Sequence, residues 1–228
     1  MANYDFRKLI IKYAKELSKD KMKSQGKDFI SYKINTRTMF ITKPGADFAN
    51  LTNDDIELEI INKETKNQEI ALHSNIYAKK TNINVIIHSN HPIIEIVANM
   101  NKKMKAPLDD MAQIVGPTLR VVQENEIKDI MKALKGRDAC LIKGNGAISL
   151  GRTIAEAHTN AMVLFKACKC HAEGQKLGGT VTIPFFESYI MHKVYKLKYS
   201  SANQELIMQK EKEEALIKPE DNPEGLVM

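Results

Sequence analysis

The sequence predicts an α/β sandwich built on a mixed sheet rather than a doubly wound parallel sheet. Two observations support this: short β-type runs alternate irregularly with amphipathic segments, and two early runs form a hairpin-like pair. The 228 residues are enough to bury a sizeable core, and a 43% hydrophobic fraction is ordinary for a globular protein. No repeat or linker interrupts residues 1–200, which are expected to form a single domain followed by a charged tail over 201–228.

The first hundred residues predict two helices that flank a β-rich region, and then a strand and a third helix. Apolar residues at helical spacing mark the helices, and alternation of apolar and polar residues marks the strands. Pro44-Gly45 closes the hairpin-like pair with a turn. The expected elements are a helix over 6–17, strands over 29–34 and 38–42, a capped turn at 51–55, a strand over 56–61, a helix over 68–80, a central strand over 85–88 and a helix over 93–100.

The second half of the chain predicts longer helices. Thr153-Ile154-Ala155-Glu156 is a capping box, in which each side chain bonds the backbone of the other residue, so a helix begins there. Gly178-Gly179 ends it. The other expectations are irregular or β structure over 112–122, a helix over 126–134, a strand over 140–142, a turn at 144–146, a helix over 184–196, a helical tail to about 216 and mobile residues beyond 218.

Charge is distributed unevenly along the chain. The net charge is +6, but residues from Asn203 onward carry seven carboxylates and three lysines, a net of −4, so the preceding part carries +10. Such a surface can attract nucleic acids or anionic metabolites. Because the lysines are scattered, tryptophan is absent and aromatics make up 6%, nucleic acid is not expected as a partner.

Cysteine usage and hydropathy indicate a cytoplasmic protein. The three cysteines, Cys140, Cys168 and Cys170, are odd in number and form no CxxC pair, which fits a reducing compartment. No apolar run approaches the length of a membrane helix, so a membrane is not expected as a partner. The first residues include Asp5, Arg7 and Lys8 and therefore lack the apolar core of a secretory signal.

Candidate chemical groups gather between residues 69 and 91. Glu69 and His73 are four residues apart and share one face of the expected helix. His88 ends an apolar strand, where α/β sheets often place ligands, and His91 follows in a loop. A carboxylate and two or three imidazoles are suitable ligands for zinc, although histidines at this spacing more often pack or face solvent.

Five segments, taken together in order and spacing, resemble one known family. They are Thr42-Lys43-Pro44-Gly45, Glu69-Ile70-Ala71-Leu72-His73, Val85-Ile86-Ile87-His88-Ser89-Asn90, Leu141-Ile142-Lys143-Gly144-Asn145-Gly146-Ala147-Ile148 and Gly151-Arg152-Thr153-Ile154-Ala155-Glu156-Ala157. Over roughly residues 5–175 the chain resembles the class II aldolase/adducin family, which includes fuculose-phosphate aldolases and ribulose-phosphate 4-epimerases. The resemblance implies a three-layer α/β/α sandwich with a central mixed, largely antiparallel sheet. It also implies a homo-oligomer, with a tetramer favoured, and a role in carbohydrate metabolism.

The resemblance also implies a site in which zinc, held by three histidines, stabilises an enediolate while a glutamate moves the proton. Glu69 stands at the position of that glutamate, and His88 at the first histidine position. The other two positions hold Asn90 and Asn145, and an amide oxygen is a weak ligand for zinc. His91 could replace Asn90 as a ligand, although one residue along a strand changes the face.

The family's phosphate-binding motifs are altered as well. The glycine of its G-N-x-S motif becomes Asp28, whose carboxylate would repel a phosphate, and its T-P-S-G motif loses the serine but gains Lys43. The positions expected to contact a substrate are Lys43, Gly45, Asn67, Gln68 and Asn145.

Two functional hypotheses follow from these departures. In the favoured one, the protein is not a conventional zinc sugar-phosphate aldolase, binds a divalent metal weakly or not at all, and binds a small polar metabolite or serves as an assembly subunit. In the alternative, it is an active aldolase or epimerase whose remodelled site uses Glu69 and His88 with zinc or another ion. Zinc enzymes of this kind need three protein ligands and an open position, and only one imidazole and one carboxylate are retained, which favours the first.

Overall fold

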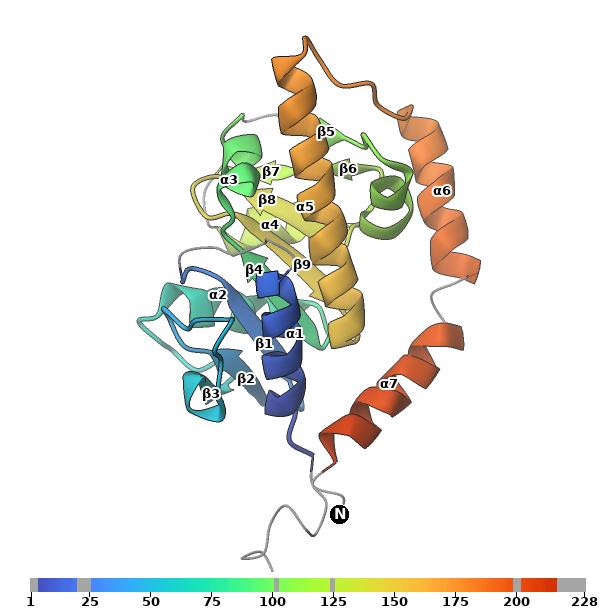
Figure 1. Cartoon of the computed structure of the whole chain (residues 1–228). Helices are drawn as coiled ribbons and strands as arrows, with labels where there is room; N and C mark the ends of the chain where they lie inside the picture. Colours follow the sequence, from blue (N-terminus) through green and yellow to red (C-terminus); the bar gives the residue numbers. More distant parts are fainter. Residues whose placement is uncertain (1–3, 20–25, 101–102, 124–125, 199–201, 217–228) are drawn as a thin grey trace, which may run out of the picture.

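The computed structural model describes residues 4–19, 26–100, 103–123, 126–198 and 202–216. A seven-stranded sheet in the order β3-β2-β1-β4-β9-β8-β7 lies between two layers of helices (Figure 1). Neighbouring strands are antiparallel except β7 and β8. The strands are β1 (Phe29–Lys33), β2 (Thr38–Thr42), β3 (Ile56–Ile60), β4 (Val85–Ser89), β7 (Val121–Val122), β8 (Ala139–Ile142) and β9 (Ala147–Gly151), with β5 (Met104–Lys105) and β6 (Thr118–Leu119) in a separate two-stranded sheet. The expected mixed, largely antiparallel sheet is confirmed.

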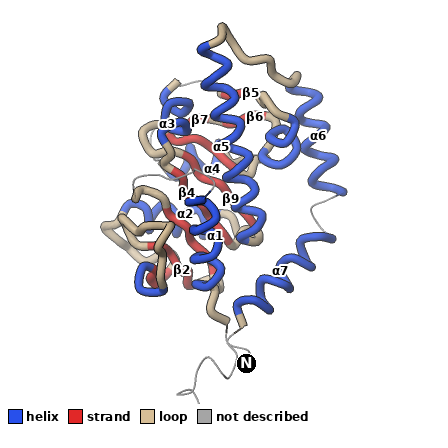
Figure 2. Tube along the Cα trace, in the orientation of Figure 1, coloured by secondary structure: helices blue, strands red, loops and turns tan. Residues whose placement is uncertain are grey.

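Helices cover both faces of this sheet (Figure 2). One face is packed by α1 and α5, with α3 against α5, and the other by α2 and α4. The helices are α1 (Arg7–Lys19), α2 (Gln68–Lys79), α3 (Pro92–Asn99), α4 (Ile127–Ala133), α5 (Ile154–Lys176), α6 (Phe185–Lys198) and α7 (Ala202–Ala215), with a 3₁₀ turn at Asn53–Asp55 and a π-helical turn at Met111–Val115. Of the helices in the described ranges, none is both long enough and apolar enough to cross a membrane.

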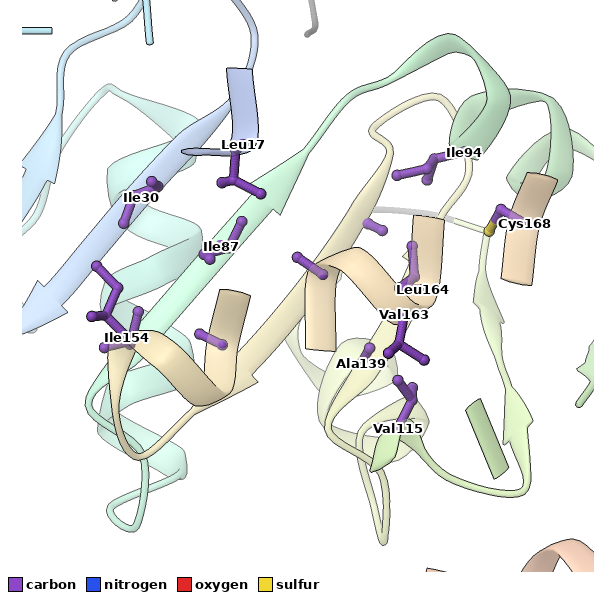
Figure 3. Packing of buried hydrophobic residues seen from close by; sticks show 14 of the residues in the cluster. Leu17, Ile30, Ile87, Ile94, Val115, Ala139, Ile154, Val163, Leu164 and Cys168 are labelled. Atoms are coloured by element: carbon purple, nitrogen blue, oxygen red, sulfur yellow. The ribbon is translucent and has the colours of Figure 1, made fainter. Parts of the chain in front are cut away.

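Strand alternation divides the apolar core into two clusters. In β4, Val85 and Ile87 face α1, α3 and α5, whereas Ile86 faces α2 and α4. Successive residues of a strand point to opposite faces, so a sheet covered on both sides needs apolar residues at almost every position. Figure 3 shows the first cluster, in which Ile30 and Ile87 on the strands lie near Leu17 and Ile154 on the helices.

Most of the expected elements are confirmed, but the short strand β5 and three other details differ. No strand is expected at 147–151, because the large Ile148 and Leu150 alternate there with small residues that are also buried, so the run lacks the apolar–polar alternation of a half-buried strand. Part of the irregular stretch is the π-helical turn at Met111–Val115. In the capping box, Thr153 Oγ1 accepts from the backbone N–H of Glu156 as expected, but the Glu156 carboxylate accepts from the backbone N–H of Arg152.

The tail begins as a helix, as expected, and α7 packs against the body of the protein. Glu211 is buried and accepts hydrogen bonds from Tyr32 Oη and from the backbone N–H of Ala155. Lys12 pairs with Glu214 at 2.8 Å. The stretch expected to be mobile beyond Lys218 lies outside the described residues, and the division of the chain at residue 200 stays a prediction.

Candidate functional site

The candidate residues meet at one end of the central sheet. β4 ends at Ser89, β8 ends at Ile142, and β9 and β1 begin at Ala147 and Phe29. Because β4 is antiparallel to β1 and β9, and β9 to β8, these four ends lie at the same edge. Helix α2 starts there too, at Gln68. Residues far apart in the sequence, at 26–31, 67–73, 88–91 and 142–147, are therefore brought together.

A closed hydrogen-bond network joins Glu69, His88 and Asn145. His88 lies on the α2 side of the sheet, in register with Ile86, and is fully buried. Its Nδ1 is 2.7 Å from Glu69 Oε2, and its Nε2 is 2.6 Å from the backbone oxygen of Asn145. The Asn145 side chain donates from Nδ2 to Glu69 Oε1 at 3.2 Å. Both ring nitrogens of His88 thus face oxygen acceptors.

This geometry favours the ionised form of Glu69. Burial by itself would raise the pKa of Glu69, but the hydrogen bond and the charge of His88 outweigh burial and bring that pKa below its usual value. Glu69 is therefore a carboxylate, which accepts, and both contacts of His88 are hydrogen bonds when each ring nitrogen carries a hydrogen. A nitrogen that carries a hydrogen has no lone pair for a metal, so in this arrangement neither ring nitrogen of His88 is directed at an open ligand position.

His73, Ser31 and Tyr77 form a second buried network beneath the first. His73 Nδ1 is 2.8 Å from Ser31 Oγ, which is 2.8 Å from Tyr77 Oη. Burial lowers the pKa of His73 to about 3, so its ring is neutral. Its Nε2 is buried and has no hydrogen-bond partner among the described residues. An unpartnered buried polar atom is uncommon and can indicate a missing ligand.

Glu69, His73 and His88 together form a cluster that could hold a metal ion. One ligand atom from each lies within 4.8 Å of the other two. The sequence predicts that His73 shares one helix face with Glu69, but the metal ligands that it predicts are His88 and His91. Its spacing of four residues from Glu69 on a helix was the signal, and the orphaned nitrogen is visible only in the structure.

Asn90 and His91, by contrast, have structural contacts. The Asn90 side chain donates from Nδ2 to the Lys27 carbonyl, and its backbone N–H donates to Asp28 Oδ1 at 2.7 Å. His91 caps helix α3, its Nδ1 accepting from the backbone N–H of Ile93, and its ring meets the Phe165 ring edge-on. His91 is not in the cluster of possible metal ligands. The three positions at which the resemblance expects zinc-binding imidazoles therefore do not fit a three-histidine zinc site.

The residues expected to contact substrate lie around the same end of the sheet. Asn67 caps helix α2, its Oδ1 accepting from the backbone N–H groups of Glu69 and Ile70. Gln68 is exposed in the first turn of that helix. Gly45, at φ +81°, donates its N–H to the Gly26 carbonyl. Lys43 is exposed and donates from Nζ to the Asp54 carbonyl at 2.6 Å.

Replacing the carboxylate of Glu69 should reduce stability in a pH-dependent way. Glu69→Gln leaves a buried N–H of His88 without its charged acceptor, and we expect unfolding free energy at pH 7 to fall by about 1–3 kcal/mol. Because the pKa of Glu69 is lower in the folded protein than in the unfolded chain, its contribution is present above pH 4.5 and is lost as pH falls through the folded value. The difference between the two proteins should therefore shrink below pH 4.5.

Urea unfolding at pH 3 to 7 measures this difference. Glu64→Gln, which changes an exposed loop carboxylate, is the matched control and should behave like the wild type at every pH. A Glu69→Gln deficit that does not change with pH would contradict the lowered pKa of Glu69.

Comparisons with known proteins agree with one another. A family model described as Class II Aldolase and Adducin N-terminal domain matches residues 8–172. The L-fuculose phosphate aldolase of Methanococcus maripaludis is 25% identical over 139 residues, which are 55% of this chain and 74% of that protein. A solved L-fuculose 1-phosphate aldolase superposes with a TM-score of 0.75 at 22% identity, over 86% of this chain and 98% of that one. The L-fuculose-1-phosphate aldolase of Thermus thermophilus superposes with a TM-score of 0.65 at 16% identity, over 76% and 95%.

Proposed function

Since the chain belongs to the class II aldolase and adducin family, we propose that it retains the family fold without zinc-dependent cleavage of sugar phosphates, and that it binds a small polar metabolite. One observation carries this proposal: both ring nitrogens of His88 bond oxygen acceptors, Glu69 and Asn145. The only imidazole at the family's ligand positions is therefore occupied by protein. Asn90, at a second position, is held by Lys27 and Asp28.

The same network is suited to binding hydroxyl groups. Glu69 keeps 19% of its side chain exposed, and Asn145 is half-buried, so both can reach a bound molecule. A carboxylate accepts from hydroxyls, and an amide both donates and accepts. Lys43, Gly45, Asn67 and Gln68 would extend this surface. A homo-oligomer, with a tetramer favoured, and a cytoplasmic location belong to the same proposal.

Elemental analysis of the purified protein and calorimetric titration with zinc test this proposal. We expect no stoichiometric metal, no zinc binding at sub-micromolar affinity and no cleavage of ketoses or ketose phosphates with added zinc. Zinc-dependent cleavage by the wild type that is abolished in Glu69→Gln would contradict it. Direct titration with ketoses and ketose phosphates, compared between the wild type and Asn145→Ala, tests the metabolite site.

A second candidate function is a metal-dependent aldolase or epimerase with a remodelled site. The observation that favours it is the unpartnered Nε2 of His73 within the Glu69–His73–His88 cluster. A neutral imidazole is a good zinc ligand, but His88 would have to give up one of its two acceptors. Zinc would then act as the Lewis acid while Glu69 moved the proton. Stoichiometric metal that is lost in both His73→Asn and His88→Ala would favour this candidate.

A further inference from the structure

A cavity of about 560 Å³ lies at the opposite end of the central sheet. Its lining includes Ile83 just before β4, Asp138 just before β8 and Gly151 at the end of β9, and α6 forms another side. β4 is five residues long, so its two ends are separated by about 15 Å. The cavity is therefore distinct from the network around Glu69 and His88. Its volume lies in the range of small-molecule sites.

The lining of this cavity is strongly basic. Its charged residues are the cationic Lys80, Arg137, Arg152, Lys193 and Lys196 and the anionic Asp138 and Glu156. Arg152 Nη2 is 2.9 Å from Glu156 Oε1, and Lys196 pairs with Asp138. These two pairs use both carboxylates, and three cationic side chains remain.

The three remaining cations have no carboxylate partner within the described parts of the chain. Lys80 lies just after α2, and burial lowers its pKa although the charge of Asp138 opposes this.

The Arg137 guanidinium donates only to neutral groups, which are Thr118 Oγ1, Thr118 O and Lys135 O. Burial and the charge of the nearby Arg120 lower the pKa of Arg137 to about 10. Lys193 Nζ lies 5.6 Å from the centre of the Tyr189 ring. Cations that share a partly buried cavity repel one another, and a multivalent anion removes that repulsion.

We propose that this cavity binds a small molecule that carries a diphosphate or longer polyphosphate group. Three uncompensated positive charges match the charge of a diphosphate near pH 7. Lysine ammonium and arginine guanidinium groups are the side chains that bind phosphate oxygens best. Helix α6 contributes Lys193, whereas Lys80 and Arg137 come from the sheet side of the cavity, so the anion would join α6 to the sheet.

Calorimetric titration with inorganic pyrophosphate tests this proposal. We expect one molecule per chain, with a Kd below about 100 µM in low salt that rises as salt is added. Lys80→Met and Lys193→Gln should each weaken binding at least about tenfold, because each removes one charge-assisted contact. Lys79→Met removes the same charge from the neighbouring exposed position and should keep wild-type affinity. Lys193 is exposed, so its replacement tests the site without disturbing the core.

Three results would overturn the proposal. One is the absence of binding heat with pyrophosphate and with tripolyphosphate. A second is an equal loss in Lys79→Met and Lys80→Met, which would indicate diffuse surface attraction. The third is binding that Glu69→Gln weakens and Lys80→Met does not, which would place the anion at the other end of the sheet. None of these depends on whether the protein binds zinc or cleaves a sugar.

Discussion

Histidine at positions 90 and 145 should complete a three-histidine zinc site around His88. We expect the double variant Asn90→His/Asn145→His to bind one zinc ion per chain at least about 100-fold more tightly than the wild type. Changes to residues that only support the ligands typically alter metal affinity by about 10–100-fold, and the gain of two ligands should have a larger effect. His88 lies in β4 and residue 90 directly follows that strand, so the two side chains point to the same face. The side chain of Asn145 already contacts Glu69. Three imidazoles with one open position form a common catalytic zinc site.

Calorimetry and elemental analysis of the purified double variant measure the gain. Asn75→His adds one imidazole to an exposed position of α2 and should leave zinc affinity unchanged. Each single variant should fall between the wild type and the double variant. A wild type that binds zinc as tightly as the double variant would refute the argument from His88.

Gly146→Ala, which adds one methyl group, should strongly lower the free energy of unfolding. We expect a loss of about 2–5 kcal/mol in unfolding free energy, a size typical of disruptive core changes. Gly146 has φ +66°, where a side chain is strained by about 1 kcal/mol. A Cβ there would also collide with the backbone oxygen of Ser89, at the end of the central strand β4. That backbone is held by pairing with β9 and cannot yield cheaply.

Gly144→Ala is the matched control for this prediction. Gly144 lies two residues away in the same turn at φ +70°, but a Cβ there meets nothing within 4 Å. Its replacement should cost only the backbone strain, about 1 kcal/mol. Urea unfolding of both variants separates the two contributions. Equal losses would mean that close packing against Ser89 is unimportant.

The sequence by itself determined the family, the fold class and most of the elements. Apolar periodicity, glycine turns and the Thr153 cap are local properties, and local properties can be predicted from a single sequence. The order and spacing of the motifs also predicted Glu69, His88, Asn90 and Asn145 as site positions, and the structure brings Glu69, His88 and Asn145 into contact.

Only the tertiary structure decided what these residues contact. Whether His88 offers a lone pair or two N–H groups depends on a carboxylate 19 residues before it and a carbonyl 57 residues after it. The orphaned Nε2 of His73 and the cavity lined by Lys80, Arg137 and Lys193 are likewise visible only after folding. The physical reason is that protonation, ligand geometry and charge compensation depend on short-range contacts between segments that are distant in the sequence. Local sequence patterns do not predict such contacts.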